Sequence, residues 1–517
     1  MDKSQGRTAR PTAASTDPAT VSGHRGLQLE ERLLFEQGSP GRSGVDLPSA
    51  PKARERLGGL KRQAPIGLPG LSEPQVIRHF TRLSQKNYAI DSGLYPLGSC
   101  TMKHNPRLNE KLARLPGFAD VHPLQPTKTT QGALELMESL AHWLTTLTGM
   151  PAVTLSPGAG AHGELCGMVA IRAALEARGE KRTRVLVPES AHGTNPATAA
   201  ACGFSVDAIP ADARGRVDLA AFKAKLGADV AAIMLTNPNT CGLFEPDIRE
   251  IAAAIHRIGG YFYCDGANFN AIVGRVRPAD LGIDAMHINL HKTFSTPHGG
   301  GGPGSGPVVF ASSLAPYAPL PYVARGPDGL RLIEHREGDA KPLGRLKGFH
   351  GQMGMFVRAL AYMMSHGGDG LAAASGDAVL NANYLLAKLN GVMSPSFEGP
   401  CMHEALFDDR FLKDTGVTTL DFAKALIDEG YHPMTMYFPL VVHGALLIEP
   451  TESESRGSLD AFIATLRALA ARAKSGDAAF FHEAPRLTPR RRLDETRAAR
   501  QPVLRWRKAT PASEAAE

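Results

Sequence analysis

Between residues 130 and 310 the sequence alternates short apolar runs with stretches of helical periodicity, and this alternation limits the possible folds more than any other feature. Apolar side chains recur every three or four residues at 163–179 and 247–260, which predicts two helices. The apolar runs lack a regular polar alternation, which indicates strands buried on both faces. These runs lie at 184–190, 231–239, 261–268 and 286–294. We therefore expect an α/β fold with a mostly parallel sheet covered by helices.

Polar side chains follow these runs, at the point where each predicted strand ends. They are Glu189 and His192, Asn237 and Asn239, Asp265 and Asn268, and His291 and Lys292. In parallel sheets, ligands bind beyond the carboxyl ends of the strands. We therefore expect these side chains to gather around one ligand.

The 517 residues correspond to about three domains of ~150 residues, or two large ones. The predicted large domain spans 116–365, and a smaller α+β domain with a long helix at 371–391 spans 366–484. The flanking parts are an extension at 1–28, an arm with a helical segment at 29–115 and a basic tail at 485–517. The extension lacks the apolar core of a secretion signal, and we interpret it as disordered rather than as a transit peptide. The tail is either a solvated end or a contact for an acidic partner or another subunit.

Composition argues against several classes of protein. The net charge of +6 is small and does not form one basic stripe, which argues against nucleic-acid binding as the main function. No apolar run approaches the ~18 residues of a membrane span, so we expect no membrane insertion. Six widely spaced cysteines without a CxxC pair indicate a reduced, cytoplasmic protein with no zinc ribbon, and we expect no metal.

The stretch SPGAGAHGE at 156–164 places small residues at the start of a predicted helix. Free backbone N–H groups and the helix dipole favour an anion at such a position, so the loop is either a phosphate cradle or a tight turn. Neither a Walker sequence nor a clean GxGxxG motif is present. The residues that would form the cradle are Gly158, Ala159, Gly160 and Ala161.

Three further side chains suggest one chemistry, although each has an ordinary alternative. Lys292 lies in apolar, glycine-rich sequence, where an amine can form a Schiff base with an aldehyde; it could also be a solvated lysine. Asp265 could keep a pyridinium nitrogen protonated, or simply cap a helix. His192 could lie over a flat cofactor, or belong to a turn. The glycine run after Lys292 could be part of the site or a flexible lid.

The order of these features is typical of a fold type I pyridoxal-phosphate enzyme: a cradle loop, His192, an Asn-Pro-Asn sequence, Asp265 and Lys292. Longer motifs make the comparison specific. They are YPLGSCTMKHNPRLNE (95–110), SPGAGAHGEL (156–165), PESAHGTNPATAA (188–200), LTNPNTCGLFE (235–245), CDGANFNAIVG (264–274) and NLHKTFSTPHGGGGPGSGP (289–307). Together they resemble the family of subunit 2 of the glycine-cleavage P-protein, the decarboxylating glycine dehydrogenases, from about residue 30 to about 508. Residues 1–28 have no recognised counterpart, and His104 stands where the family commonly has tyrosine.

The resemblance implies the PLP-dependent transferase fold of type I, with a mostly parallel seven-stranded sheet. It also implies a cofactor and a role for each residue. Pyridoxal 5′-phosphate would be bound covalently to Lys292, with Asp265 at its ring nitrogen and His192 on its ring face. Asn237 or Asn239 would contact the ring 3-oxygen, and the 158–162 loop would hold the phosphate. The further cofactor contacts that we expect are His291 and Asn268.

The resemblance also implies a reaction and partners. Glycine would lose CO2, and its aminomethyl group would pass to the lipoamide of an H-protein, so no nicotinamide site is needed. Subunits of this type pair with P-protein subunit 1 as an α2β2 heterotetramer, and Lys292 places this chain on the catalytic side. Cys100 would lie near the substrate entrance or be an ordinary loop thiol. The alternatives are another fold type I enzyme, such as an amino-acid decarboxylase or a desulfurase, and a non-catalytic scaffold that binds H-protein.

Overall fold

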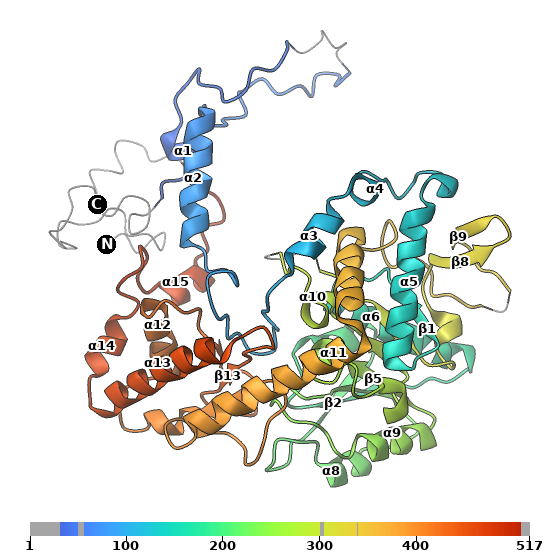
Figure 1. Ribbon diagram of the computed structural model, residues 1–517. Helices are drawn as coiled ribbons and strands as arrows, with labels where there is room; N and C mark the ends of the chain where they lie inside the picture. The colour runs from blue at the N-terminus through green and yellow to red at the C-terminus, as the bar shows by residue number, and fades with distance from the viewer. Residues whose placement is uncertain (1–30, 50–55, 300–303, 339, 508–517) are drawn as a thin grey trace. The chain divides into compact units, whose positions relative to one another are not determined.

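The computed structural model describes residues 31–49, 56–299, 304–338 and 340–507 (Figure 1). The expected N-terminal extension at 1–28 and the last part of the basic tail, 508–517, lie outside the described residues. The centre of the glycine run, 300–303, lies outside them as well. No helix within the described ranges is long and apolar enough to cross a bilayer.

The chain divides into two compact units, which we describe separately. The larger unit comprises Gly93–Ala423 and His432–Ala478, and the smaller comprises Met1–Ser92, Lys424–Tyr431 and Ala479–Glu517. In the smaller unit, Glu31 accepts hydrogen bonds from Arg82 on α2 (Glu73–Lys86), with an Nε–Oε2 distance of 2.7 Å. The ring of Phe35 on α1 (Leu34–Gln37) stacks on Trp506 with centroids 5.2 Å apart. The arm and the basic tail therefore contact each other.

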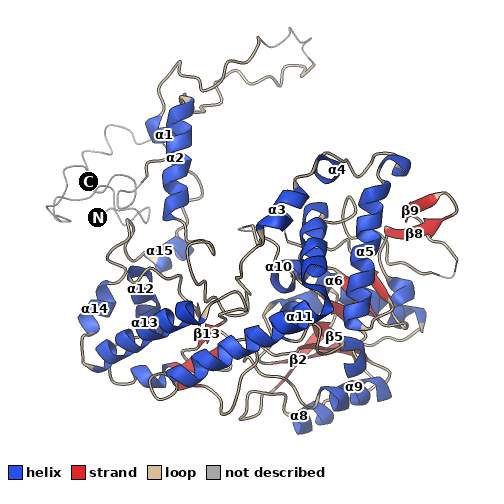
Figure 2. Cartoon of the chain, in the orientation of Figure 1, coloured by secondary structure: helices blue, strands red, loops and turns tan. Residues whose placement is uncertain are grey.

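A seven-stranded sheet forms the centre of the larger unit, in the order β1-β7-β6-β5-β4-β2-β3. Its strands β2 and β5 are labelled in Figure 2. Strands β3, β2, β4, β5 and β6 pair in parallel, and β7 pairs antiparallel with both of its neighbours. The prediction of a mostly parallel sheet is confirmed. The strands are β1 (Ala152–Thr154), β2 (Arg184–Pro188), β3 (Ser205–Ile209), β4 (Val230–Thr236), β5 (Tyr261–Asp265), β6 (Ala285–His287) and β7 (Val308–Phe310).

Successive strand residues enter two different cores, because side chains alternate between the faces of a strand. Ile233 and Phe262 pack in one hydrophobic cluster, with α9 (Ile248–Arg257). Ala232 and Tyr263 pack in the other, with α6 (Gly160–Ala177). Every residue of β4 is buried, as the unbroken apolar run predicts. The remaining helices of the sheet domain are α5 (Gln131–Thr148), α7 (Thr194–Ala201), α8 (Leu219–Ala224) and α10 (Leu290–Thr293).

The long helix is much longer than predicted. We expected it at 371–391, but α11 spans Met353–Leu389 with a non-helical residue, Gly367, inside it. The SHGGDG sequence at 365–370 obscures the periodicity, since glycine disfavours a helix interior, and tertiary packing overrides this preference. Met355, Phe356 and Leu360 in the first half of the helix are buried.

A second, antiparallel sheet in the order β10-β11-β13-β12 confirms the predicted smaller α+β domain. Its strands are β10 (Ser394–Pro395), β11 (Ala405–Asp408), β12 (Thr435–Met436) and β13 (Leu446–Ile448). The other elements are α3 (Arg107–Ala113), α4 (Pro116–Ala119), the hairpin of β8 (Tyr322–Gly326) and β9 (Gly329–Ile333), α12 (Thr419–Asp428), α13 (Arg456–Lys474), α14 (Ala478–Glu483) and α15 (Glu495–Arg500).

Candidate active site

The carboxyl ends of β4, β5 and β6 bring the predicted side chains to one edge of the central sheet. Asn237 follows β4 directly, and Asp265 is the last residue of β5. We expected Lys292 at the end of a strand, but it lies in the short helix α10 that follows β6. The apolar sequence before Lys292 concealed this single helical turn, which is too short for a visible period.

Asp265 is the most extensively bonded of these residues. Its carboxylate accepts hydrogen bonds from the Asn195 side-chain amide at 3.0 Å and from the Ala267 N–H at 2.9 Å. The Nε2 atom of His287 lies 3.4 Å from Oδ1. Burial alone would raise the pKa of Asp265, but His287, Asn195 and the Ala267 N–H together hold it below its usual value. Asp265 is therefore a buried carboxylate that stays ionised at neutral pH.

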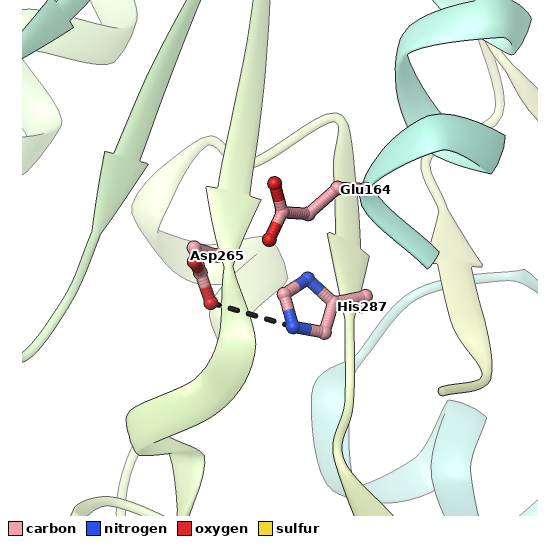
Figure 3. A group of neighbouring side chains, drawn as sticks. All are labelled: Glu164, Asp265 and His287. Atoms are coloured by element: carbon pink, nitrogen blue, oxygen red, sulfur yellow. Dashed lines mark ion pairs between the residues drawn. The ribbon is translucent and has the colours of Figure 1, made fainter. Parts of the chain in front are cut away.

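His287 and Glu164 complete a buried group around Asp265 (Figure 3). The Nδ1 atom of His287 lies 2.6 Å from the hydroxyl of Tyr263. Burial raises the pKa of Tyr263 and lowers the pKa of His287. The phenol therefore stays protonated, and its O–H donates a hydrogen bond to Nδ1. The hydrogen of the neutral imidazole is then on Nε2, where it faces the Asp265 carboxylate.

Glu164, on the first turns of α6, is buried beside Asp265. Its two carboxyl oxygens accept hydrogen bonds from the hydroxyls of Thr194 at 2.7 Å and Thr198 at 3.2 Å. Burial, followed by the nearby charge of Asp265, raises the pKa of Glu164 to about 7. Glu164 was not among the residues predicted from the sequence, because a glutamate in a helix usually faces solvent.

His192 is exposed at the same edge, in the turn before α7. Its Nδ1 atom lies 2.9 Å from the Thr194 hydroxyl, which also contacts Glu164. The ring is edge-on to Phe438, with centroids 5.7 Å apart. An imidazole in this position is fixed by the turn and leaves a ring face available for a flat ligand.

Lys292 is half-buried, and its Nζ donates a hydrogen bond of 2.8 Å to the carbonyl of Ser99. Its charge reaches Asp265: besides the stronger effects of burial and His287, Lys292 helps to lower the pKa of that carboxyl. The amine and the carboxylate therefore belong to one electrostatic site. Ser99 was not predicted from the sequence either, since its contact spans 193 residues of sequence.

The predicted cradle surrounds the N-terminus of α6. Three of its residues, Ala159, Gly160 and Ala161, precede or begin the helix, whereas the Gly158 N–H is already donated to Nδ1 of His162 at 3.1 Å. A Cβ at Gly158 would lie 3.4 Å from the Lys347 amine and 3.5 Å from the Gln352 amide nitrogen. These two donors strengthen the case for an anion site, and only the fold reveals them.

His291 lies near this loop but in a neutral form. A Cβ at Gly304 would lie 3.2 Å from Nδ1 of His291 and 3.6 Å from the carbonyl oxygen of Gly158. Burial, with the neighbouring charges of His298 and Lys292, lowers the pKa of His291 to about 3. His291 can therefore give a hydrogen bond to an anion here, but no positive charge.

The three predicted asparagines differ in what their side chains already bind. Asn239 is fully engaged: its amide donates to the Gly215 carbonyl at 2.8 Å, and its oxygen accepts from the N–H groups of Cys241 and Leu243. Asn237 accepts from the Glu245 N–H at 2.9 Å, but its buried Nδ2 has no partner. Asn268 donates to the Pro238 carbonyl at 2.9 Å and has an unpartnered oxygen.

The donor and acceptor groups fit pyridoxal phosphate. Unpartnered buried polar atoms collect at this edge of the sheet, whereas such atoms are rare in protein interiors. They include atoms of Asn195, Thr236, Asn237, Asn268, Asn289 and Ser305. An amine for the aldehyde, a carboxylate for the ring nitrogen and an open helix N-terminus for the phosphate occur together here.

Cys100 and His104, for which the sequence indicates no definite role, lie next to this site. Cys100 follows Ser99 and is a free, partly buried thiol. Burial raises the pKa of Cys100 to about 11, so it is not a reactive thiolate at neutral pH. His104 is exposed; its carbonyl accepts from the Ser295 hydroxyl, and its N–H donates to the Ser453 hydroxyl at 3.2 Å.

Comparisons with known proteins show which family the chain resembles. Residues 374–482 match the family described as glycine dehydrogenase, C-terminal domain, and residues 162–301 match aminotransferase class-V. A Caulobacter vibrioides protein named probable glycine dehydrogenase (decarboxylating) subunit 2 is 67% identical over 99% of both chains. A protein of the same name from Exiguobacterium sibiricum is 51% identical and covers 92% of this chain and 97% of its own length.

Solved structures show the same fold. An inhibitor-bound glycine decarboxylase (P-protein) of the glycine cleavage system has a TM-score of 0.67 and 22% identity, covering 79% of this chain and 92% of its own. A sphingosine-1-phosphate lyase of Burkholderia pseudomallei has a TM-score of 0.61 and 16% identity, covering 82% and 96%. These two likenesses support the fold class predicted from the sequence.

Proposed function

Because the chain belongs to the family of glycine dehydrogenase (decarboxylating) subunit 2, we propose that it uses pyridoxal phosphate to decarboxylate glycine and transfers the aminomethyl group to the lipoyl arm of an H-protein. The observation that carries the proposal is the placement of Asp265 at the end of β5 and of Lys292 in α10, directly after the neighbouring strand β6. The charge of Lys292 also helps to lower the pKa of Asp265. Bound pyridoxal phosphate supplies an aldehyde for Schiff-base chemistry and a ring that accepts the electron pair left by a departing carboxylate.

Each side chain of the site has a task in this proposal. Lys292 would hold the cofactor aldehyde through its amine, and the Ser99 carbonyl, 2.8 Å from Nζ, accepts a hydrogen of this amine when the amine is free. Asp265 would keep the ring nitrogen protonated, with its charge maintained by His287 and Asn195. His192 would position the cofactor from one ring face.

The start of α6 would hold the phosphate. Backbone N–H groups of residues 159–161 would face it, and the Lys347 amine and Gln352 amide lie close to this loop. His291 contributes a neutral hydrogen bond. For the ring 3-oxygen we propose Asn237 rather than Asn239, since only Asn237 has a free donor, its Nδ2.

The proposal includes partners beyond this chain. A protein named subunit 2 implies a partner subunit, and we propose subunit 1 in an α2β2 heterotetramer, with the lipoylated H-protein as the acceptor of the aminomethyl group. The six free cysteines support a reducing compartment, and we propose the cytoplasm.

The lysine assignment is tested by the covalent chromophore. The purified chain, loaded with cofactor, is reduced with borohydride and digested, and the modified peptide should contain Lys292. Lys292→Ala should lose the chromophore, whereas Lys181→Ala, at a surface loop, should keep it. A covalent chromophore retained by the Lys292→Ala variant would show that another amine binds the cofactor.

The reaction is tested by isotope exchange. Labelled CO2 should enter the carboxyl group of glycine only when this chain, subunit 1 and lipoylated H-protein are all present. Exchange of another amino acid, or release of sulfide from cysteine, would favour a different fold type I enzyme. Failure to bind cofactor would favour the scaffold alternative.

A further inference from the structure

Residues 96–101 form a loop that is attached to the smaller sheet. Leu97 bridges to Ile448 in the antiparallel sense, and the Glu449 N–H donates to the Pro96 carbonyl at 3.2 Å. A Cβ at Gly98 would lie 2.6 Å from the carbonyl oxygen of Leu447, so no other residue fits there without displacing β13. The loop is therefore positioned by the antiparallel sheet β10-β11-β13-β12, although it contacts Lys292, which follows β6 of the seven-stranded sheet.

Two residues of this loop have an unfavourable backbone conformation. Ser99 has φ 60° and Thr101 has φ 51°, in the left-handed region. Side chains with a Cβ disfavour this region, and a β-branched threonine does so most. Such a conformation persists only where the surrounding structure enforces it.

Two buried glutamates enforce it. The Ser99 N–H donates to Oε2 of Glu404 at 2.7 Å. The N–H and hydroxyl of Thr101 donate to the two oxygens of Glu449, at 2.8 and 2.6 Å. Both glutamates have 0% of their surface exposed, so water does not compete for these bonds. Glu404 thus holds Ser99, and Glu449 holds Thr101.

The consequence is the direction of one carbonyl. The Ser99 carbonyl lies between the two fixed N–H groups and accepts a hydrogen bond of 2.8 Å from Nζ of Lys292. The same loop continues to Lys103, whose buried amine donates to the Thr293 carbonyl at 3.0 Å and pairs with Glu452 at 2.5 Å. The loop therefore contacts α10 at two neighbouring residues.

We propose that Glu404 and Glu449 are positioning residues that hold the Ser99–Thr101 loop so that the Ser99 carbonyl receives the Lys292 amine whenever this amine is not bound to the cofactor. The part that concerns the cofactor rests on the proposed function. The part that concerns the loop stands on the geometry of the chain alone.

The two carboxyl groups are not equivalent. Burial and the charge of Glu449 raise the pKa of Glu404 well above its ordinary value, so Glu404 is a neutral acid. Other groups that face the pair are Lys292, the Asn270 amide, His403 and the Cys100 thiol, with the thiols of Cys241 and Cys401 near Glu404. Burial lowers the pKa of His403, which leaves it neutral. Among the described residues, Glu449 faces three donors with both oxygens, whereas Glu404 accepts from the N–H and the hydroxyl of Ser99.

This difference predicts different effects of glutamine at the two positions. Glutamine at position 404 would keep an oxygen for the Ser99 N–H and match a neutral acid, so Glu404→Gln should preserve the loop. Glu449→Gln would replace an acceptor oxygen with an NH2 group that faces donors, and this should release the loop. One ligand atom of each of His403, Glu404 and Glu449 lies within 4.8 Å of the others, but the carboxyl oxygens of the two glutamates are already occupied by these donors, which favours a loop clamp over a metal site.

Cys100 reports on the loop in the cofactor-free chain. It lies between the two strained residues, and the other five cysteines are buried. The test is the rate at which iodoacetamide alkylates Cys100 at fixed pH, followed by mass spectrometry of the Cys100 peptide. Glu449→Gln and Glu404→Leu should raise the rate about tenfold, because local opening exposes the thiol. Glu404→Gln should stay within about twofold of the natural chain.

Asp284→Asn is the matched control. Asp284 is a buried carboxylate that accepts the Phe262 N–H at 2.7 Å, at the far end of β5 from Asp265. The Asp284→Asn substitution should leave the alkylation rate of Cys100 unchanged. Should Glu449→Gln not fold, Thr101→Gly in that background should restore a folded chain with slow alkylation, since glycine adopts a left-handed φ without strain. An unchanged rate in folded Glu449→Gln, or an equal rise in Asp284→Asn, would overturn the clamp.

A second readout tests the contact with Lys292. In the loaded enzyme, the pH midpoint of the chromophore that Lys292 forms should fall by about half a pH unit or more in Glu449→Gln, because a nearby negative charge is lost. It should not move in Glu404→Gln or Asp284→Asn. A midpoint that stays unchanged in Glu449→Gln while the loop opens would refute the role toward Lys292 but leave the proposed reaction intact.

Discussion

Asp265 and Glu164 are neighbouring buried carboxyl groups whose pKa values move in opposite directions. The pKa of Asp265 is lowered against the effect of burial by His287 and by two hydrogen bonds, whereas burial and the charge of Asp265 raise the pKa of Glu164 to about 7. Two carboxylates this close cannot both ionise without cost. Of these two carboxyl groups the site therefore keeps one ionised. This is Asp265, the residue that faces the ring nitrogen in the proposed function.

Replacement of Glu164 by glutamine should change how stability depends on pH. A raised pKa gives stability that is fully present below the ordinary value of 4.5 and is lost as the pH rises through about 7. Glutamine mimics the neutral acid at every pH. Relative to the natural chain, Glu164→Gln should therefore gain up to about 3 kcal/mol in the free energy of unfolding between pH 4.5 and pH 8.

Glu176→Gln, an exposed position on the same helix, is the control and should show no such trend. The measurement is chemical unfolding of the cofactor-free chain at several pH values. A constant difference between the Glu164→Gln variant and the natural chain from pH 5 to pH 8 would mean that Glu164 is already ionised.

Asp265→Asn should leave the fold intact but reduce the rate of decarboxylation. Asparagine retains an oxygen for the Ala267 N–H, and its NH2 can donate to the unpartnered Oδ1 of Asn195 once that amide turns, but it cannot keep the ring nitrogen protonated. We expect a loss of about 10²–10³-fold in the exchange of labelled CO2 into glycine, with cofactor still bound. Asp229→Asn, at an exposed pair with Arg184, should be within about twofold. A rate in Asp265→Asn close to that of the natural chain would remove Asp265 from the proposed mechanism.

The sequence predicts the residues that follow strands better than those that approach from elsewhere. Asp265 and Asn237 were found because a polar residue after an unbroken apolar run marks the end of a buried strand. Glu164 and His287 were missed for the opposite reason. Glu164 lies inside α6, where pattern alone assigns a glutamate to solvent. His287 is the last residue of β6, but the apolar run at 286–294 makes it look like an interior residue of a longer strand.

The residues of the loop clamp could not be predicted together from the sequence. Ser99 and Glu404 are separated by 305 residues, and Thr101 and Glu449 by 348, so no local pattern links them. Left-handed serine and threonine are also invisible in the sequence, since glycine and asparagine are the residues expected in that conformation. The family resemblance includes these positions but assigns them no role.

Gly306→Ala should weaken the phosphate site. Gly306 donates its N–H to the Pro157 carbonyl at 3.1 Å, and a Cβ there would lie 2.5 Å from the Ala159 carbonyl carbon and 3.0 Å from the Gly160 nitrogen. The methyl group would push the cradle open, at a cost of about 1–3 kcal/mol in stability. Titration with pyridoxal phosphate should show at least about tenfold weaker binding.

Gly132→Ala serves as the control for this change. Gly132 lies inside α5, and a Cβ there would have no heavy atom of a neighbour within 4 Å, so alanine should be neutral or stabilise the helix by up to about 1 kcal/mol. Unaltered cofactor affinity in Gly306→Ala would show that the phosphate lies away from residues 159–160.

Asn237→Ala and Asn239→Ala should affect different properties, although the residues are two positions apart. Asn239 has its whole amide engaged with Gly215, Cys241 and Leu243, so Asn239→Ala leaves buried backbone groups unpaired and should cost about 1–3 kcal/mol of stability. The free Nδ2 of Asn237 instead predicts weaker cofactor binding in Asn237→Ala, by about tenfold, with a smaller loss of stability. Thermal unfolding and cofactor titration of both variants separate the two effects. The reverse pattern, weak binding in Asn239→Ala alone, would transfer the ring contact to Asn239.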